Sequence, residues 1–259
     1  MVPICLGTDQ CQSLVLDLEL HTLRHFCLTS DFLVQENRFC QLGNIRMALN
    51  AIAKNLKIPE KSFAGRITQF FLKRGNRVVE EKAVEHSGIE ADHYVLEVGF
   101  GPGIGLEAAY NKIKDGKGKV FGLDLSPYML ETASKLMSEG ITNNQVELHL
   151  GSVMEMPFES NTFDRIFHCN CFYFWPDFDK CAQELYRVLK PNTFMITTVD
   201  SKKLKASEEK GFLKYGNADI EFYMDVLRKN KFENVAMETH GPESKQYQVI
   251  SAFKGAKEE

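Results

Sequence analysis

The chain has 259 residues, 44% of them hydrophobic and 25% charged, which is typical of a globular protein with one large domain. Its net charge of −4 leaves no basic surplus to neutralise a phosphate backbone, so nucleic acid is not expected as a partner. No apolar run approaches the ~20 residues that a membrane-spanning helix needs, so no membrane span is expected.

The cysteines and the first residues indicate a compartment. None of the seven cysteines stands in C-x-x-C spacing, so we expect neither a metal site nor a disulfide framework. The N-terminus lacks a basic stretch followed by an apolar run, and acids such as Asp9 and Glu19 fall early, which disfavours a secretory signal or a mitochondrial presequence. We therefore expect a soluble, cytoplasmic protein with free thiols.

Residues 1–46 differ in composition from the rest of the chain. They contain no lysine, whereas lysine is frequent after Met47. We predict that residues 1–46 are a poorly ordered or accessory extension and that residues 47–259 form the functional domain. A short helical lid on the main domain is the alternative interpretation of the extension.

The segment at about 60–88 is predicted to be an N-terminal helical lid of the main domain. It reads as one or two helices that end at Gly88. Arg66, Arg74 or Asn76 in this segment are candidates to meet a ligand, although a solvated helix face explains the charges equally well.

Strands and helices then alternate to the end of the chain. The expected strands are residues 93–99, 120–125, 145–150, 163–169, 193–200, 232–240 and 246–253. The expected helices are residues 103–114, 126–140, 177–190 and 219–230. We predict Ser126 as the N-cap of the second helix, Pro127 as its first residue and Gly140 as its stop, and Pro191 ends the third. This order predicts an α/β fold with a mostly parallel seven-stranded sheet, helices on both faces and an antiparallel C-terminal strand pair.

A glycine-rich turn, VLEVGFGPGIG at residues 95–105, directly follows the first strand. Ligands bind beyond the carboxyl ends of parallel strands, and glycine lets the backbone approach them closely. The dinucleotide fingerprint G-x-G-x-x-G fails in both registers, because Ile104 and Leu106 stand where its third glycine belongs. A nicotinamide-dependent dehydrogenase is therefore disfavoured.

The spacing E-x-G-x-G-x-G instead resembles motif I of the class I S-adenosylmethionine-dependent methyltransferases. The resemblance covers about residues 90–200 and points to the small-molecule branch with the quinone-ring methyltransferases. It implies a Rossmann-like fold and S-adenosyl-L-methionine as the cofactor. The turn that would pass beneath the methionine and ribose consists of Gly99, Phe100, Gly101 and Gly103, and the acid at Glu97 would help to orient the cofactor's amino group.

Later segments match the same family in order. Asp124 stands where an acid binds the ribose hydroxyls; an N-terminal charge of the following helix is the competing interpretation. Leu125 and Met129 match positions that pack against ribose and adenine. Ser152 replaces the family's usual aspartate, so its hydroxyl offers an uncharged acceptor for adenine, and Val153 offers its backbone N–H.

The segment HCNCFYFWPD at residues 168–177 follows the fourth strand. Asn170 matches the position that meets the methionine end of the cofactor. Residues 171–175 are either walls of an apolar or aromatic substrate pocket or core residues. Tyr173 or His168 are candidates for a base, but transfer from a sulfonium needs none, so we assign no catalytic residue. Cys169 and Cys171 are expected to point in opposite directions if the strand continues.

We therefore expect methyl transfer from S-adenosylmethionine to a small-molecule acceptor, by positioning and desolvation. The alternative is a catalytically inactive protein that binds the cofactor as an accessory or regulator. The oligomeric state is not predicted.

Overall fold

The computed structural model describes residues 50, 54–210, 213 and 216–256, without the side chains of residues 63–64, 67–68, 70–74 and 244. All of these belong to one compact unit, residues 47–259. The predictions for residues 1–46 and for the Arg74 side chain fall outside the described residues. The domain boundary at residue 46 therefore stays a prediction.

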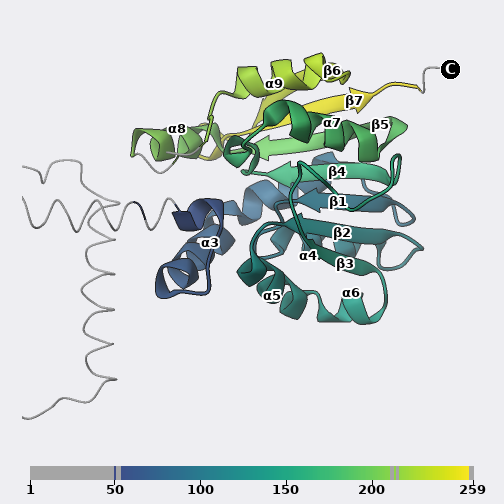
Figure 1. Cartoon of the computed structure of the whole chain (residues 1–259), viewed down its shortest axis with the longest axis horizontal. Coiled ribbons are helices and arrows are strands. Elements are labelled where there is room, and N and C mark those ends of the chain that lie inside the picture. Colours follow the sequence, from purple (N-terminus) through teal and green to yellow (C-terminus); the bar gives the residue numbers. More distant parts are fainter. Residues whose placement is uncertain (1–49, 51–53, 211–212, 214–215, 257–259) are drawn as a thin grey trace, which may run out of the picture. The chain divides into compact units, whose positions relative to one another are not determined.

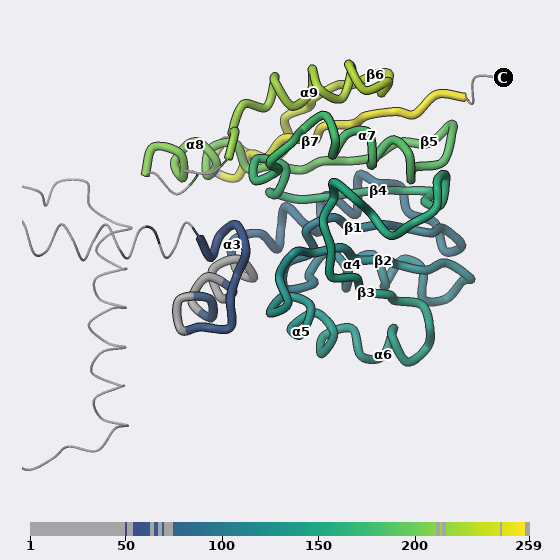
Figure 2. Tube along the Cα trace, viewed as in Figure 1, coloured from purple at the N-terminus to yellow at the C-terminus, as the bar shows by residue number. Residues whose placement is uncertain are grey.

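The domain is built on a seven-stranded sheet with the strand order β3-β2-β1-β4-β5-β7-β6. The strands are β1 (Tyr94–Val98), β2 (Lys119–Asp124), β3 (Val146–Leu150), β4 (Phe163–Cys169), β5 (Leu189–Val199), β6 (Glu233–His240) and β7 (Tyr247–Lys254). The first five pair in parallel, and β7 runs antiparallel to both of its neighbours, β5 and β6. In Figure 2 the strands are stacked from β3, near α6 at the bottom, to β6, near α9 at the top. This Rossmann-like arrangement confirms the predicted fold.

Helices cover both faces of the sheet (Figure 1). They are α3 (Phe63–His86), α4 (Ile104–Ile113), α5 (Pro127–Leu136), α6 (Ser138–Thr142), α7 (Phe178–Val188), α8 (Ser201–Glu209) and α9 (Ile220–Lys229). One hydrophobic core lies between the sheet and helices α3, α4 and α5, and the other lies between the sheet and helices α7 and α9. Two cores on opposite faces are what a mostly parallel sheet requires.

The alternation of side chains along β1 decides where its acid lies. Leu96 and Val98 enter the core under α7 and α9, while Val95 enters the core under α3 and α4. Because side chains of a strand alternate between its faces, Glu97 shares the face of Val95. The acid in the middle of the first strand therefore lies on the side of α3 and α4.

The predicted helix at residues 126–140 differs from the observed structure. Ser126 caps α5 through a bond from the Met129 N–H (3.2 Å), and Pro127 is its first residue, as expected. Gly140 does not stop the helix; α5 ends at Leu136 and Gly140 lies inside the short α6. A Cβ on Gly140 would lie 2.5 Å from Cγ2 of Val146, so close packing on β3 explains this glycine.

Two further boundaries differ from the prediction. Helix α7 ends at Val188, and β5 already begins at Leu189, so the strand contains Pro191. Asn192 adopts a positive φ of 59° within this strand, a conformation that asparagine tolerates. Helix α8 was not predicted, and Asp200 caps it by accepting the Lys203 N–H (2.9 Å).

The segment before the sheet forms a single long helix. Helix α3 begins after Ser62, whose hydroxyl accepts the Gly65 N–H (3.0 Å), and ends two residues before Gly88, which has a φ of 57°. Its C-terminal half contributes Val79 and Ala83 to the core. That half is part of the helical layer of the domain, and a lid function remains a prediction.

Candidate functional site

A cavity of about 340 Å³ lies beyond the carboxyl ends of the central strands β1, β2 and β4. The turns after β1, β2, β3 and β4 all contribute to its wall, together with α3 and the loop before it. Predicted residues on this wall are Gly99, Gly101, Asp124, Leu125, Met129, Ser152, Val153, Asn170 and, from the lid segment, Asn76. Most of these predicted residues belong to the turns that follow the strands β1 to β4.

The glycine turn after β1 requires its glycines for two different reasons. Gly99, Gly101 and Gly103 have φ values of 71°, 50° and 90°, which are unfavourable for other residues. A Cβ on Gly101 would meet no atom within 4 Å, so this residue borders open space in the cavity wall. Gly105 has an ordinary φ, and its reason is the carboxylate of Glu97, which fills the space beside it.

Two buried carboxylates meet at the first turn of α4. Glu80 of α3 is 5% exposed and Glu97 of β1 is 1% exposed. The N–H of Gly105 acts on Glu80 and the N–H of Leu106 acts on Glu97, as expected of free N–H groups at a helix start. Each carboxylate nevertheless keeps one buried oxygen, Oε2, without a partner among the described residues.

Burial makes both acids hold a proton more tightly. Loss of solvation raises the pKa of Glu80 to about 8. Loss of solvation and the neighbouring charges of Glu80 and Asp124 raise the pKa of Glu97 well above its usual range. Of the two, only Glu80 lies on the cavity wall. Sequence reasoning missed Glu80, although Asn76 and Glu80 lie one helical turn apart on one face of α3.

Asp124, at the end of β2, spans the glycine turn and the start of α5. Its Oδ2 accepts the N–H of Gly101 (2.9 Å) and its Oδ1 accepts the N–H of Ser126 (2.8 Å). Burial raises its pKa, and these backbone bonds act in the opposite direction. Each carboxylate oxygen can accept a second bond, so the side chain retains acceptor capacity toward the cavity.

The loop after β3 carries Ser152 and Val153. The Ser152 hydroxyl accepts the N–H of Met154 (3.2 Å), so it stabilises the loop's own turn. Gly151 connects this loop to β2 by donating to the Asp124 carbonyl (2.9 Å). Met154, which was not predicted, lines the cavity as well.

Asn170 turns the chain at the end of β4. It has a φ of 47°, its Nδ2 donates to Oδ1 of Asn76 (3.2 Å), and its Oδ1 accepts the N–H of Asp200 (3.2 Å). The strand ends at Cys169, so the expected alternation does not continue, and both Cys169 and Cys171 line the cavity. Burial raises the pKa of both thiols.

The aromatic segment after Asn170 divides between cavity and core. Phe174 and Trp175 line the cavity. Phe172 is a core residue, 0% exposed and stacked on Tyr223 with ring centroids 4.4 Å apart. Tyr173 is not among the lining residues, and burial raises the pKa of its phenol.

His168 is a packed core histidine. Its Nε2 lies 3.0 Å from the Tyr223 hydroxyl and 2.9 Å from the Thr197 hydroxyl, and burial lowers its pKa to about 3. The ring is therefore neutral at physiological pH and lies outside the cavity wall. Neither of the two candidate bases borders the cavity.

Three of the residues proposed to bind the cofactor do not form the wall. Glu97 is buried and does not line the cavity, and Gly103 is the N-cap of α4. Phe100 is 1% exposed and packs in the core against Gly122, where a Cβ would come within 2.7 Å of its ring. The lining residues that were not proposed are Leu56, Lys57, Pro59, Glu80, Val98, Pro102, Leu123, Gly151, Met154, Cys169 and Pro176. Those from the loop before α3 carry no sequence motif.

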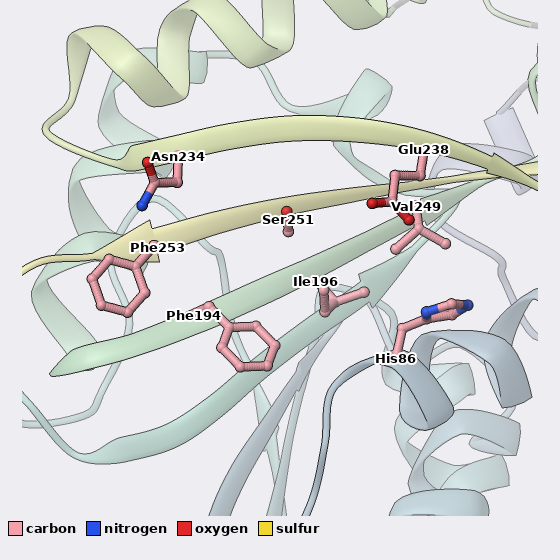
Figure 3. Close-up of a pocket in the computed structure, with 8 residues that line it drawn as sticks. All are labelled: His86, Phe194, Ile196, Asn234, Glu238, Val249, Ser251 and Phe253. Atoms are coloured by element: carbon pink, nitrogen blue, oxygen red, sulfur yellow. The ribbon is translucent and has the colours of Figure 1, made fainter.

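A second hollow of about 360 Å³ lies on the strands β5, β6 and β7 (Figure 3). Phe194, Ile196, Val249 and Phe253 project from the strands, and His86 faces them from the end of α3. This hollow lacks the glycine turn and the strand-end acids, so the cavity beyond the parallel strands is the stronger candidate.

Two negative findings apply to the part of the chain described above. No helix there has the length and apolarity needed to cross a membrane. No group of three or more His, Cys, Asp or Glu side chains there is placed to hold a metal ion.

Comparison with known proteins agrees with this geometry. Residues 96–197 match a family described as a methyltransferase domain. The chain is 28% identical over 144 residues to the uncharacterized methyltransferase YdaC of Bacillus subtilis, a match that covers 56% of this chain and 76% of YdaC. It is 30% identical over 149 residues to a demethylmenaquinone methyltransferase of Oceanobacillus iheyensis, covering 56% of this chain and 59% of that protein.

A solved structure with the same fold is Haemonchus contortus phosphoethanolamine N-methyltransferase 2, in complex with phosphomonomethylethanolamine and S-adenosylhomocysteine. Its TM-score is 0.59 at 18% identity, and the match covers 73% of this chain and 57% of that one. The chain thus spans under two thirds of two of these three proteins.

Proposed function

Because the chain belongs to the class I S-adenosylmethionine-dependent methyltransferases and S-adenosylmethionine is its cofactor, we propose that it transfers a methyl group to a small-molecule acceptor in the cavity beyond β1, β2 and β4. The observation that carries this proposal is the joint wall of that cavity. The glycine turn and the strand-end acid form the part of the wall expected to bind the cofactor. The aromatic side chains form a separate part that is available to an acceptor.

The residues present fit this cofactor. Asp124 can accept bonds from two vicinal ribose hydroxyls, because its carboxylate oxygens keep acceptor capacity. The open space beside Gly101 admits the ligand close to the backbone. The buried, unpartnered oxygen of Glu80 suits a cationic group.

The remaining contacts follow from the positions of the loops. We assign Gly99 to the methionine and ribose part, and Leu125 and Met129 to ribose and adenine. Ser152 and Val153 lie where adenine is expected, and Asn170 fixes the β4 turn at the methionine end through its bonds to Asn76 and Asp200. Because the Ser152 hydroxyl already accepts a bond from Met154, we assign the adenine contact to the Val153 backbone.

The cofactor supplies a methyl group already activated by the sulfonium charge, so the protein's task is to position the acceptor and exclude water. Phe174 and Trp175 provide an apolar wall for the acceptor, with Met154 from the β3 loop. His168 and Tyr173 lie off this wall, and His168 is held by Tyr223 and Thr197. We therefore propose no dedicated base.

Methyl transfer to a panel of metabolites tests the proposal. The purified chain would be incubated with methyl-labelled cofactor and acceptors that include quinols, amines and phenols. We expect a labelled small product and stoichiometric S-adenosylhomocysteine for at least one acceptor class. Cofactor binding without transfer to any member would favour the alternative, a catalytically inactive accessory protein.

Two substitutions distinguish the part of the cavity proposed to bind the acceptor from the part proposed to bind the cofactor. Phe174→Ala should raise the KM for the acceptor while leaving cofactor affinity unchanged, and Asp124→Ala should lower cofactor affinity. If Phe174→Ala left acceptor KM unchanged, the assignment of the aromatic wall to the acceptor would be wrong.

A cytoplasmic location and a small acceptor also remain proposals. The free thiols Cys169, Cys171 and Cys181 are compatible with a reducing compartment. Cell fractionation of the tagged full-length chain tests the location.

A further inference from the structure

The cavity wall contains an acid that family resemblance did not identify. Glu80 lies on the wall, whereas Glu97, the acid of the glycine motif, is buried and does not line the cavity. Both carry one buried oxygen without a partner among the described residues. A buried acceptor without a donor is costly, so the arrangement is complete only when a donor from the cavity reaches it.

The two carboxylates are held together by the fold. Asn76 and Glu80 project from one face of α3, and the Asn76–Asn170 bond (3.2 Å) fixes that face to the β4 turn. Glu97 fills the space beside Gly105, and the charge of Glu80 acts on its carboxylate. The N–H groups of Gly105 and Leu106 serve one carboxylate each.

The surroundings supply little positive charge to this pair. The titratable or charged groups around it are Arg77 and Glu81 on α3, Asp124 at the end of β2, Cys169 and Cys171 at the β4 turn and Lys57 before α3. Arg77 is exposed and pairs with Glu81 (3.3 Å). Both carboxylates are buried, and the charge of Glu80 opposes the ionisation of Glu97, so without a cation the empty pair retains a proton.

We propose that Glu80 binds the α-ammonium group of the cofactor directly, with the buried Glu97 as a proton-sharing partner, and that cofactor binding expels the proton held by the pair. This inference rests on the proposed placement of the cofactor in this cavity. It makes Glu80 a cofactor-binding residue and makes cofactor affinity depend on pH. The proton leaves to solvent as the ammonium enters, so charge balances within the site.

The pH dependence has a defined sign. A cation favours the ionised pair, so affinity rises with pH as long as the empty pair is protonated. One released proton corresponds to a change in Kd of at most about tenfold per pH unit. The dependence of Kd on pH vanishes above about pH 8, the pKa of Glu80.

Proton release on binding is the direct test. The full-length protein would be titrated with S-adenosylhomocysteine by calorimetry at about pH 7, in buffers with different ionisation enthalpies. We expect release of most of one proton. Methylthioadenosine, which lacks the amino-acid end, should bind without it. Binding of S-adenosylhomocysteine without proton release overturns the inference alone. Absence of any binding overturns the cofactor placement and the inference with it.

Variants assign the proton to a residue. Glu80→Gln should abolish most of the proton release and weaken binding at least about tenfold near pH 8, where one decade is a typical effect of losing a charged hydrogen bond. Glu85→Gln is the matched control, because Glu85 is exposed on the same helix and is not among the charges that act on Glu80; it should change neither quantity. If Glu80→Gln kept the affinity and the proton release while Glu97→Gln lost them, the role of Glu80 would be wrong.

Discussion

The carboxylate of Glu97 occupies the space that a side chain at residue 105 would fill: a Cβ on Gly105 would lie 2.3 Å from Oε1 of Glu97. This explains why the fourth glycine of the turn, with an ordinary φ, is needed alongside three glycines whose φ is positive. The acid in the strand and the glycine in the helix are therefore one structural unit.

Substitution of this glycine should destabilise the domain. Gly105→Ala forces the Cβ into the Glu97 carboxylate, so we expect the free energy of unfolding to fall by about 1–3 kcal/mol, as in other overpacked sites. Gly75→Ala is the matched control, because its Cβ meets nothing within 4 Å in helix α3. It should be neutral or stabilise by about 0.5–1 kcal/mol. Chemical denaturation measures both; equal effects would contradict the packing explanation.

Asp124 should stabilise the cofactor-free protein as well as bind the cofactor. Asp124→Ala removes the acceptor of two backbone N–H groups at 2.8 and 2.9 Å, so we expect the free energy of unfolding to fall by about 1–3 kcal/mol. Loss of the ribose contact should also reduce cofactor affinity at least about tenfold.

The variant Asp124→Asn keeps one oxygen acceptor and should lose less stability than Asp124→Ala while still weakening binding. Thermal melts and calorimetry on both variants separate the two roles. Unchanged cofactor affinity in both would end the ribose assignment and leave Asp124 as a residue of the helix start.

Glu80 should make the cofactor-free protein less stable as the pH rises, and this loss should be clearest between about pH 6.5 and 8, because below 6.5 the lowered pKa of His168 acts in the opposite direction. The pKa of Glu80 is raised from 4.5 to about 8 in the folded state, so between these values the folded protein binds a proton that the unfolded chain has released. The stabilisation that Glu80 contributes is therefore fully present below about pH 4.5 and is lost progressively up to about pH 8. Over this range its contribution to the free energy of unfolding falls by at most about 1.4 kcal/mol per pH unit.

Urea denaturation at a series of pH values measures this slope. Glu80→Gln should flatten it, because an amide does not titrate, whereas Glu85→Gln, at an exposed position of the same helix, should leave it unchanged. A slope that persists in Glu80→Gln would assign the titration to another group.

Truncation tests the untested domain boundary. A chain that starts at Met47 should keep its melting temperature within a few degrees and still bind the cofactor, since the compact unit comprises residues 47–259. Loss of soluble protein on truncation would show that residues 1–46 contribute to the folded domain.

Sequence alone determined the parts of this protein that depend on local order. The alternation of strands and helices predicted the sheet, and the spacing of Gly99, Gly101 and Gly103 predicted a turn with left-handed geometry. Asp124 and the β4 turn followed at the expected places because each lies at the end of a buried strand, and the carboxyl ends of parallel strands meet at one edge.

Only the tertiary structure decided which side chains face the cavity. Glu80 reaches it because helix α3 packs across β4 and β5, a contact between distant segments that no local pattern encodes. Cys169 and Cys171 share one wall because Asn170, with a positive φ, interrupts the alternation that a strand would impose. Phe172 and Phe174 lie two residues apart in similar sequence surroundings, yet one stacks on Tyr223 in the core and the other borders the cavity. Local propensity sets the elements and their ends, whereas the packing of one element on another sets the direction in which each side chain is buried.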